Sequence, residues 1–238
     1  MRRRLVLFDI DGTLLSAGGI SARALSATLR EIFGTEGDAA HYDYSGKTDP
    51  QIVRELMRGA GFAEAEIDER LPGTLAQYQG RLLSWLRPED VVPKPGVAPL
   101  LQALALEERV TLGLLTGNLE PCARAKIAPL DANRYFPFGA YGSDHEDRYR
   151  LPAVALERGR AAAGFTFGGP DVVIVGDSVH DVLCGRSLGV RAVAVATGKT
   201  PPARLAEVAP HALLGDFMDT EAAVRAILGG ETLNPDSR

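Results

Sequence analysis

The sequence predicts an α/β fold, in which a parallel sheet carries helices on both faces and an all-helical segment follows the first strand. Two observations support this prediction. Short apolar runs alternate with helical periodicities over residues 97–214, as is typical of strands joined by crossover helices. Residues 18–90, in contrast, show helical periodicities and no apolar run that indicates a buried strand.

The elements of the sheet are expected in the following order. The first strand is an apolar run at residues 4–8, which ends at Asp9 and a Gly12-Thr13 turn. Further strands are expected at residues 110–115, 138–142, 171–175, 192–196 and 212–214. Helices are expected between them, at residues 97–107, 120–130, 151–164 and 181–188.

The segment after the first strand is expected to contain three helices. Apolar residues recur at helical spacing near residues 25–33, a second helix begins at Asp49-Pro50, and a third lies within residues 64–86. A Pro/Gly cluster at residues 91–96 indicates a linker back to the sheet. We therefore predict a Rossmann-like core domain at residues 1–17 and 91–238, with a small all-helical cap domain inserted at residues 18–90.

The composition is that of an ordinary soluble globular protein. Of 238 residues, 45% are hydrophobic and 24% charged, and the net charge of −5 argues against a nucleic-acid partner. No stretch approaches the roughly 20 apolar residues of a membrane span, so no membrane partner is expected. Cys122 and Cys184 form no CxxC pair, which argues against a zinc site or a disulfide framework and fits a cytoplasmic location. The tail at residues 231–238 is expected to be frayed, and the oligomeric state is left open.

Polar side chains follow three of the predicted strands. Asp9 follows the first strand, Thr116 the second and Asp177 a later one. Because ligands in open α/β sheets bind outside the carboxyl ends of the strands, we expect these three residues to converge.

Asp9 and Asp11 are two residues apart, so both side chains can point to one side. Two carboxylates this close repel each other unless a cation lies between them, and Mg²⁺ prefers such oxygen ligands. The alternative is an ordinary turn, in which Asp and Gly are common.

The other two strand ends offer complementary groups. The hydroxyl of Thr116 and the backbone N–H groups of Gly117 and Asn118 could cradle a phosphate, although a plain turn is equally compatible. Asp181 lies one helical turn after Asp177 and on the same side, so both could face the metal. Capping of the next helix by Asp177 or Ser178 is compatible with this role.

Together the three motifs, hydrophobic-D-x-D-G-T, T-G-N and G-D-x-x-x-D in this order, resemble those of the haloacid dehalogenase-like hydrolase superfamily. The helical insertion resembles the subclass with a small helical cap, and the phosphoglycolate phosphatase-like members in particular. The resemblance covers roughly residues 4–229. It implies a Mg²⁺-dependent phosphatase that acts on a small phosphorylated metabolite.

The resemblance also implies roles for the acidic residues. Asp9 would attack phosphorus and form an aspartyl-phosphate, while Asp11 would protonate the leaving oxygen and later deprotonate water. Mg²⁺ would be held by Asp9, by the backbone carbonyl of Asp11 and by Asp177. Asp181 would bind the metal through water or orient the basic residue of the site.

For the phosphoryl oxygens, the resemblance implies Thr116, Gly117 and Asn118 as binding residues. Lys47 lies in the Gly46–Asp49 loop of the predicted cap, where it could contact an anionic leaving group. The alternative for Lys47 is an exposed side chain beside a capped helix start.

One feature departs from the family pattern. The usual Lys between the second and third motifs is missing, because residues 139–156 contain none. Arg148 or Arg150 must then supply the catalytic cation, since a guanidinium can bind phosphate oxygens. We favour Arg148, which precedes the next predicted helix by a distance similar to that of the usual Lys.

Other functions on the same fold stay open. A phosphohexomutase of the β-phosphoglucomutase type would pass the phosphoryl group from Asp9 to another hydroxyl. A 2-haloacid dehalogenase uses the same nucleophile without a metal, and Asp11 argues against it. A non-catalytic binding protein is disfavoured because all five polar positions are intact, namely Asp9, Asp11, Thr116, Asp177 and Asp181.

Overall fold

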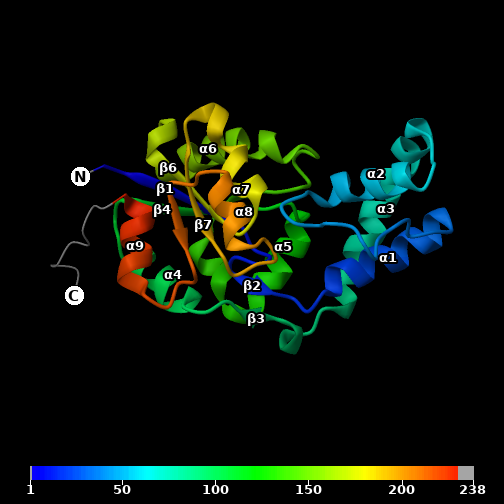
Figure 1. The fold of residues 1–238 in the computed structure, drawn as a ribbon, viewed down its shortest axis with the longest axis horizontal. Coiled ribbons are helices and arrows are strands. Elements are labelled where there is room, and N and C mark those ends of the chain that lie inside the picture. Colours follow the sequence, from blue (N-terminus) through cyan, green and yellow to red (C-terminus); the bar gives the residue numbers. More distant parts are fainter. Residues whose placement is uncertain (1, 230–238) are drawn as a thin grey trace.

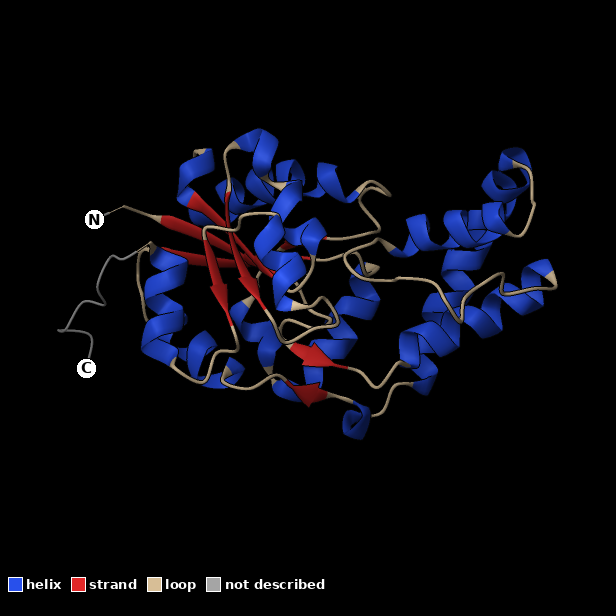
Figure 2. Ribbon diagram, viewed as in Figure 1, coloured by secondary structure: helices blue, strands red, loops and turns tan. Residues whose placement is uncertain are grey.

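The central sheet has six parallel strands in the order β5-β4-β1-β6-β7-β8, which confirms the predicted α/β class (Figures 1 and 2). The computed structural model describes residues 2–229, so the predicted fraying from residue 231 lies outside it. The strands are β1 (Arg4–Phe8), β4 (Val110–Leu115), β5 (Gly139–Ala140), β6 (Val172–Gly176), β7 (Arg191–Val195) and β8 (Ala212–Leu214).

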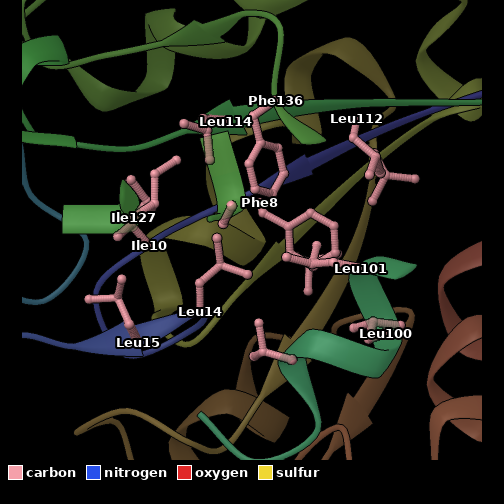
Figure 3. Close-up of a cluster of buried hydrophobic side chains, with 14 of the residues drawn as sticks. Phe8, Ile10, Leu14, Leu15, Leu100, Leu101, Leu112, Leu114, Ile127 and Phe136 are labelled. Atoms are coloured by element: carbon pink, nitrogen blue, oxygen red, sulfur yellow. The ribbon is translucent and has the colours of Figure 1, made fainter. Parts of the chain in front are cut away.

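Helices cover both faces of the sheet. Successive side chains of a strand point to opposite faces, so each strand packs against helices on both sides. In β1, Val6 and Phe8 pack with α4, α5 and α9, whereas Leu5 and Leu7 pack with α6. Figure 3 shows Phe8 against Phe136, with ring centroids 6.0 Å apart. The flanking helices are α4 (Val97–Ala105), α5 (Glu120–Ile127), α6 (Leu151–Ala163), α7 (Val179–Cys184), α8 (Pro202–Glu207) and α9 (Thr220–Leu228).

The remaining helices lie together at the end of the molecule that is farther from both termini (Figure 1). They are α1 (Ile20–Phe33), α2 (Asp49–Gly59) and α3 (Glu64–Trp85). They share a hydrophobic cluster of their own, to which the core contributes Leu119 and Cys122. None of the helices within residues 2–229 combines the length and the apolar character that crossing a membrane requires.

The chain leaves the core and returns to it at one place. The short strand β2 (Leu15–Ser16) pairs in antiparallel register with β3 (Val92–Pro93), which lies inside the predicted linker. On the strength of this pairing and of the separate hydrophobic cluster, we propose residues 18–90 as a cap domain.

Some element boundaries differ from the prediction. The helix expected at 181–188 begins at Val179, because the Ser178 hydroxyl accepts a hydrogen bond from the Asp181 N–H and caps the helix start. It ends at Cys184, and a 3₁₀ turn at Arg186–Leu188 follows. The predicted strands and helices of the core occur in the expected order, and the structure adds helices α8 and α9, which the sequence reading did not include.

Candidate active site

The three polar strand ends meet at the carboxyl edge of the sheet. Strand β1 pairs with β4 on one side and with β6 on the other. Strands β4 and β5 extend the sheet in one direction from β1, whereas β6, β7 and β8 extend it in the other. This switch point is where open α/β sheets bind their ligands. The structure brings carboxylate oxygens of Asp9, Asp177 and Asp181 within 4.8 Å of one another, and all three residues are buried.

Arg148 lies against this carboxylate cluster. It begins a 3₁₀ turn directly before α6, and only 2% of its side chain is exposed. Its Nη2 donates to Asp9 Oδ1 at 3.1 Å and also to Asp181 Oδ1. Arg150 is 71% exposed, and its nearest acidic partner is Asp147 at 3.9 Å. Of the two arginines that the sequence offered, Arg148 is therefore the one in contact with Asp9.

The cluster carries more negative than positive charge. Burial, together with the Asp181 carboxylate, raises the pKa of Asp9 to about 7 despite the opposing effect of Arg148. Burial and the carboxylates of Asp9 and Asp181 raise the pKa of Asp177 to about 8. One guanidinium against three carboxylates leaves a charge that a divalent cation would neutralise. The buried oxygen donors therefore fit Mg²⁺, which prefers such ligands.

Two glycines let the backbone approach Asp177. A Cβ at Gly12, whose φ is +92°, would lie 2.4 Å from Asp177 Oδ2, and a Cβ at Gly198 would lie 1.6 Å from the same oxygen. The Thr13 hydroxyl donates to Asp177 Oδ1 at 3.1 Å. Gly12 and Thr13 of the D-x-D-G-T motif thus position the Asp177 carboxylate at the end of β6.

Asp11 belongs to a second polar group beside the first. Its Oδ2 accepts hydrogen bonds from Asn118 Nδ2 at 2.7 Å and from Lys126 Nζ at 2.6 Å. Asn118 Nδ2 also donates to Thr116 Oγ1 at 2.8 Å. Through its bond to Asp11, Asn118 connects the end of β4 to the end of β1.

Sequence reasoning missed Lys126, which lies within a predicted helix and was assigned no role. A signal was present, because Lys126 shares its helix face with Cys122, Ala123 and Ile127, all of them buried. A lysine on a buried helix face is rare unless its charge is paired with an acidic group. Here its side chain is 1% exposed.

A cavity of about 330 Å³ opens between the core and the cap helices. Most of the candidate residues line it: Asp9, Asp11, Lys47, Thr116, Gly117, Asn118, Arg148 and Asp177. Lys47 reaches it from the cap, but its Nζ is paired with Glu55 Oε2 at 2.7 Å and with the Tyr42 hydroxyl at 3.1 Å. The cap loop touches the core closely, since a Cβ at Gly117 would lie 2.0 Å from the Lys47 carbonyl oxygen.

Asp49 connects the cap to the core at the same cavity. Its Oδ2 accepts a hydrogen bond from the Leu119 N–H at 2.8 Å, and its own N–H donates to the Gly117 carbonyl at 2.8 Å. Burial raises the pKa of Asp49 to about 6, although nearby Lys126 and the Leu119 hydrogen bond oppose the shift. The carboxylate is therefore held ionised at neutral pH at a cost in stability.

We expect the Asp49→Asn variant to gain stability relative to wild type as the pH rises from 4 to 7.5. A carboxyl whose pKa is raised on folding is protonated in both states at low pH. The unfolded state ionises first as the pH rises, so the cost to the folded state grows above the unfolded pKa and is complete above the folded pKa. The relative gain is about 1–3 kcal/mol in unfolding free energy, and the amide still offers an oxygen to the Leu119 N–H. Urea denaturation of both proteins at each pH measures it, and a constant difference across the range would contradict the account.

A buried carboxylate cluster with one arginine lies at the switch point of this parallel sheet, where active sites of open α/β folds are usually found. The model of the family described as haloacid dehalogenase-like hydrolase matches residues 6–195. The chain belongs to this family.

Individual relatives agree with this assignment. A phosphoglycolate phosphatase of Agrobacterium fabrum is 27% identical over 90% of this chain and 88% of its own length. Phosphoglycolate phosphatase 1 of Pseudomonas aeruginosa is 26% identical over 99% of this chain and 86% of its own. The predicted class, a phosphatase of the haloacid dehalogenase-like family, is confirmed by the family match and these relatives.

Solved structures show the same fold. A predicted phosphatase from Clostridium acetobutylicum has a TM-score of 0.73 at 15% identity, covering 94% of this chain and 99% of the other. A putative β-phosphoglucomutase from Bacteroides vulgatus has a TM-score of 0.68 at 19% identity, covering 96% and 90%. At these identities the likeness concerns the fold alone.

Proposed function

We propose that this chain is a Mg²⁺-dependent phosphatase that hydrolyses a small phosphorylated metabolite through an aspartyl-phosphate on Asp9. The observation that carries the proposal is the environment of Asp9: a buried carboxylate at a strand end, held by Arg148 at 3.1 Å and lining the cavity. Asp177 and Asp181 lie close to Asp9, and Asp177 would share a bound cation with it.

The reaction has two steps on this chain's own residues. Asp9 attacks phosphorus while Asp11 gives its proton to the leaving oxygen, so that an alcohol leaves and an aspartyl-phosphate forms. Asp11, now a carboxylate, then takes a proton from water as that water attacks the phosphoryl group. Arg148 keeps Asp9 oriented and balances part of its charge.

The remaining residues hold the phosphoryl group and the metal. Thr116, Gly117 and Asn118 bind phosphoryl oxygens from the β4 end of the cavity. Asp9, the Asp11 carbonyl and Asp177 hold Mg²⁺, which screens the repulsion between nucleophile and phosphate when bound. Both oxygens of Asp181 accept hydrogen bonds from the protein, from Arg148 and from Ser178, which favours an orienting role over direct ligation.

Mg²⁺ is expected to stabilise the protein in the absence of any substrate. At about one hundred times its dissociation constant, it should raise the thermal midpoint by roughly 5–10 °C. Differential scanning fluorimetry with and without Mg²⁺ measures the shift after treatment with a chelator. The Asp177→Asn variant should lose it, whereas Asp131→Asn, the same change at an exposed carboxylate paired with Arg134, should keep it. Equal shifts in all three proteins would refute the site.

The relatives named above indicate which substrate to test first. Phosphate release from 2-phosphoglycolate, within a panel of phosphorylated metabolites, tests the phosphatase and ranks its substrates. Isomerisation of a sugar phosphate that depends on a bisphosphate primer, without phosphate release, would replace the phosphatase by the mutase alternative. The cytoplasmic location and the lack of nucleic-acid and membrane partners stay predictions.

A further inference from the structure

Lys126 is a buried ammonium group directly behind the proposed proton donor. It comes from the last turn of α5, and its Nζ donates to Asp11 Oδ2 and to Asn118 Oδ1, both at 2.6 Å. Burial alone would lower the pKa of Lys126, but the carboxylates of Asp11 and Asp49 raise it above its ordinary value. The side chain is therefore charged at neutral pH.

Asp11, Asn118 and Lys126 form a closed triangle. Asn118 donates to Asp11 Oδ2 at 2.7 Å and accepts from Lys126, so each member bonds to both of the others. Within residues 2–229 both donors use Oδ2, which leaves Oδ1 outside the triangle. The Asp11 side chain is 44% exposed and lines the cavity, whereas Lys126 is 1% exposed.

The difference in exposure between Asp11 and Lys126 matters because the Asp11 carboxyl must reach a leaving oxygen. A carboxyl on a half-exposed loop side chain has several rotamers, and proton transfer needs an oxygen held within hydrogen-bond reach of its target. A buried ammonium on a helix is a fixed point, because its stem is packed and its position does not depend on the loop. Two bonds to a single oxygen hold the carboxyl plane and keep the other oxygen available.

We propose that Lys126 is a positioning residue for Asp11, which holds the carboxyl ready to protonate the leaving oxygen while Asp9 attacks phosphorus. This inference rests on the proposed phosphatase function. The proton passes from Asp11 to the oxygen of the departing alcohol as the P–O bond breaks and the bond from Asp9 to phosphorus forms. The Asp11 carboxylate that remains lies beside the Lys126 ammonium, which balances its charge.

The proposal predicts a dependence on the leaving group, which a purely structural lysine would not produce. Phenyl phosphate and p-nitrophenyl phosphate are similar in size, but phenolate, with a conjugate acid pKa near 10, needs a proton far more than nitrophenolate does. Because kcat/KM reports the phosphoryl transfer to Asp9, it isolates the step in which the proton is given.

We expect Lys126→Met to lower kcat/KM by on the order of 10²-fold or more for phenyl phosphate and by less than about tenfold for p-nitrophenyl phosphate. For phenyl phosphate the loss should fall on kcat more than on KM. Lys126→Gln, which keeps an N–H donor on a side chain one atom shorter, should recover part of the loss. The matched control is Lys199→Met, at an exposed lysine that also lines the cavity, and it should leave the ratio between the two substrates at the wild-type value.

Equal losses of Lys126→Met on both substrates, or no loss on phenyl phosphate, would overturn the positioning role. Retained turnover of p-nitrophenyl phosphate shows that the variant is folded, and Lys126→Gln gives a second reading if the Met variant is not. Failure of the proposed function looks different, since the wild-type protein would then hydrolyse neither ester in the presence of Mg²⁺.

Discussion

The Asp9→Asn variant is expected to lose phosphatase activity by at least about a thousandfold while it keeps its fold. An amide cannot act as the nucleophile, and nothing else in the cluster occupies the end of β1. The change removes a carboxylate that burial already disfavours, since the pKa of Asp9 is raised to about 7. The thermal midpoint without Mg²⁺ should therefore be no lower than that of wild type.

Steady-state hydrolysis of p-nitrophenyl phosphate with Mg²⁺, measured beside circular dichroism melting curves, tests this expectation. The comparison of the two readouts separates lost chemistry from lost structure. Turnover within tenfold of wild type would show that Asp9 is not the nucleophile. An inactive but unfolded variant would contradict the electrostatic account of the cluster.

The second large effect is expected at Arg148. Replacing it with methionine removes the guanidinium that contacts both Asp9 and Asp181, and leaves their carboxylates buried without this partner. Breaking such a buried pair costs about 3–5 kcal/mol in unfolding free energy. Activity should fall to background as well, because Asp9 loses the group that orients it.

Arg150→Met is the matched control, two residues away in the same 3₁₀ turn. Arg150 is 71% exposed, so its loss should change the unfolding free energy by no more than about 0.5 kcal/mol. Urea denaturation and turnover of both variants, side by side, decide the question. If Arg150→Met were the inactive protein, the assignment of the missing family lysine to Arg148 would be wrong.

The convergence of the polar strand ends could be predicted from the sequence because its markers are local. A buried run that ends in Asp9, Thr116 or Asp177 can be read one strand at a time, and the convergence of parallel strand ends supplies the rest. Arg148 could also be singled out, because its spacing before the next helix is a local feature. The contact between Arg148 and Asp9 depends on the fold, whereas the position of Arg148 before the next helix can be read from the sequence.

Contacts that depend on packing between distant elements were not accessible in this way. Lys126 meets Asp11 across 115 positions of the chain, and a lysine on a helix ordinarily indicates a solvated face. Lys94 was assigned to a linker, yet its Nζ donates to the Thr197 carbonyl at 2.6 Å and lines the cavity. Asp49 was assigned to a helix start, and its bond to Leu119 appears only once the cap is placed on the core.

The most direct test of the central claim is to trap the covalent intermediate. The enzyme is mixed with Mg²⁺ and substrate, quenched in acid within milliseconds, reduced with borohydride and digested for mass spectrometry. An aspartyl-phosphate is converted by borohydride to homoserine, so the account predicts this residue at position 9 and nowhere else in the chain. Full turnover with no modification at Asp9, or modification at another carboxylate, would contradict it.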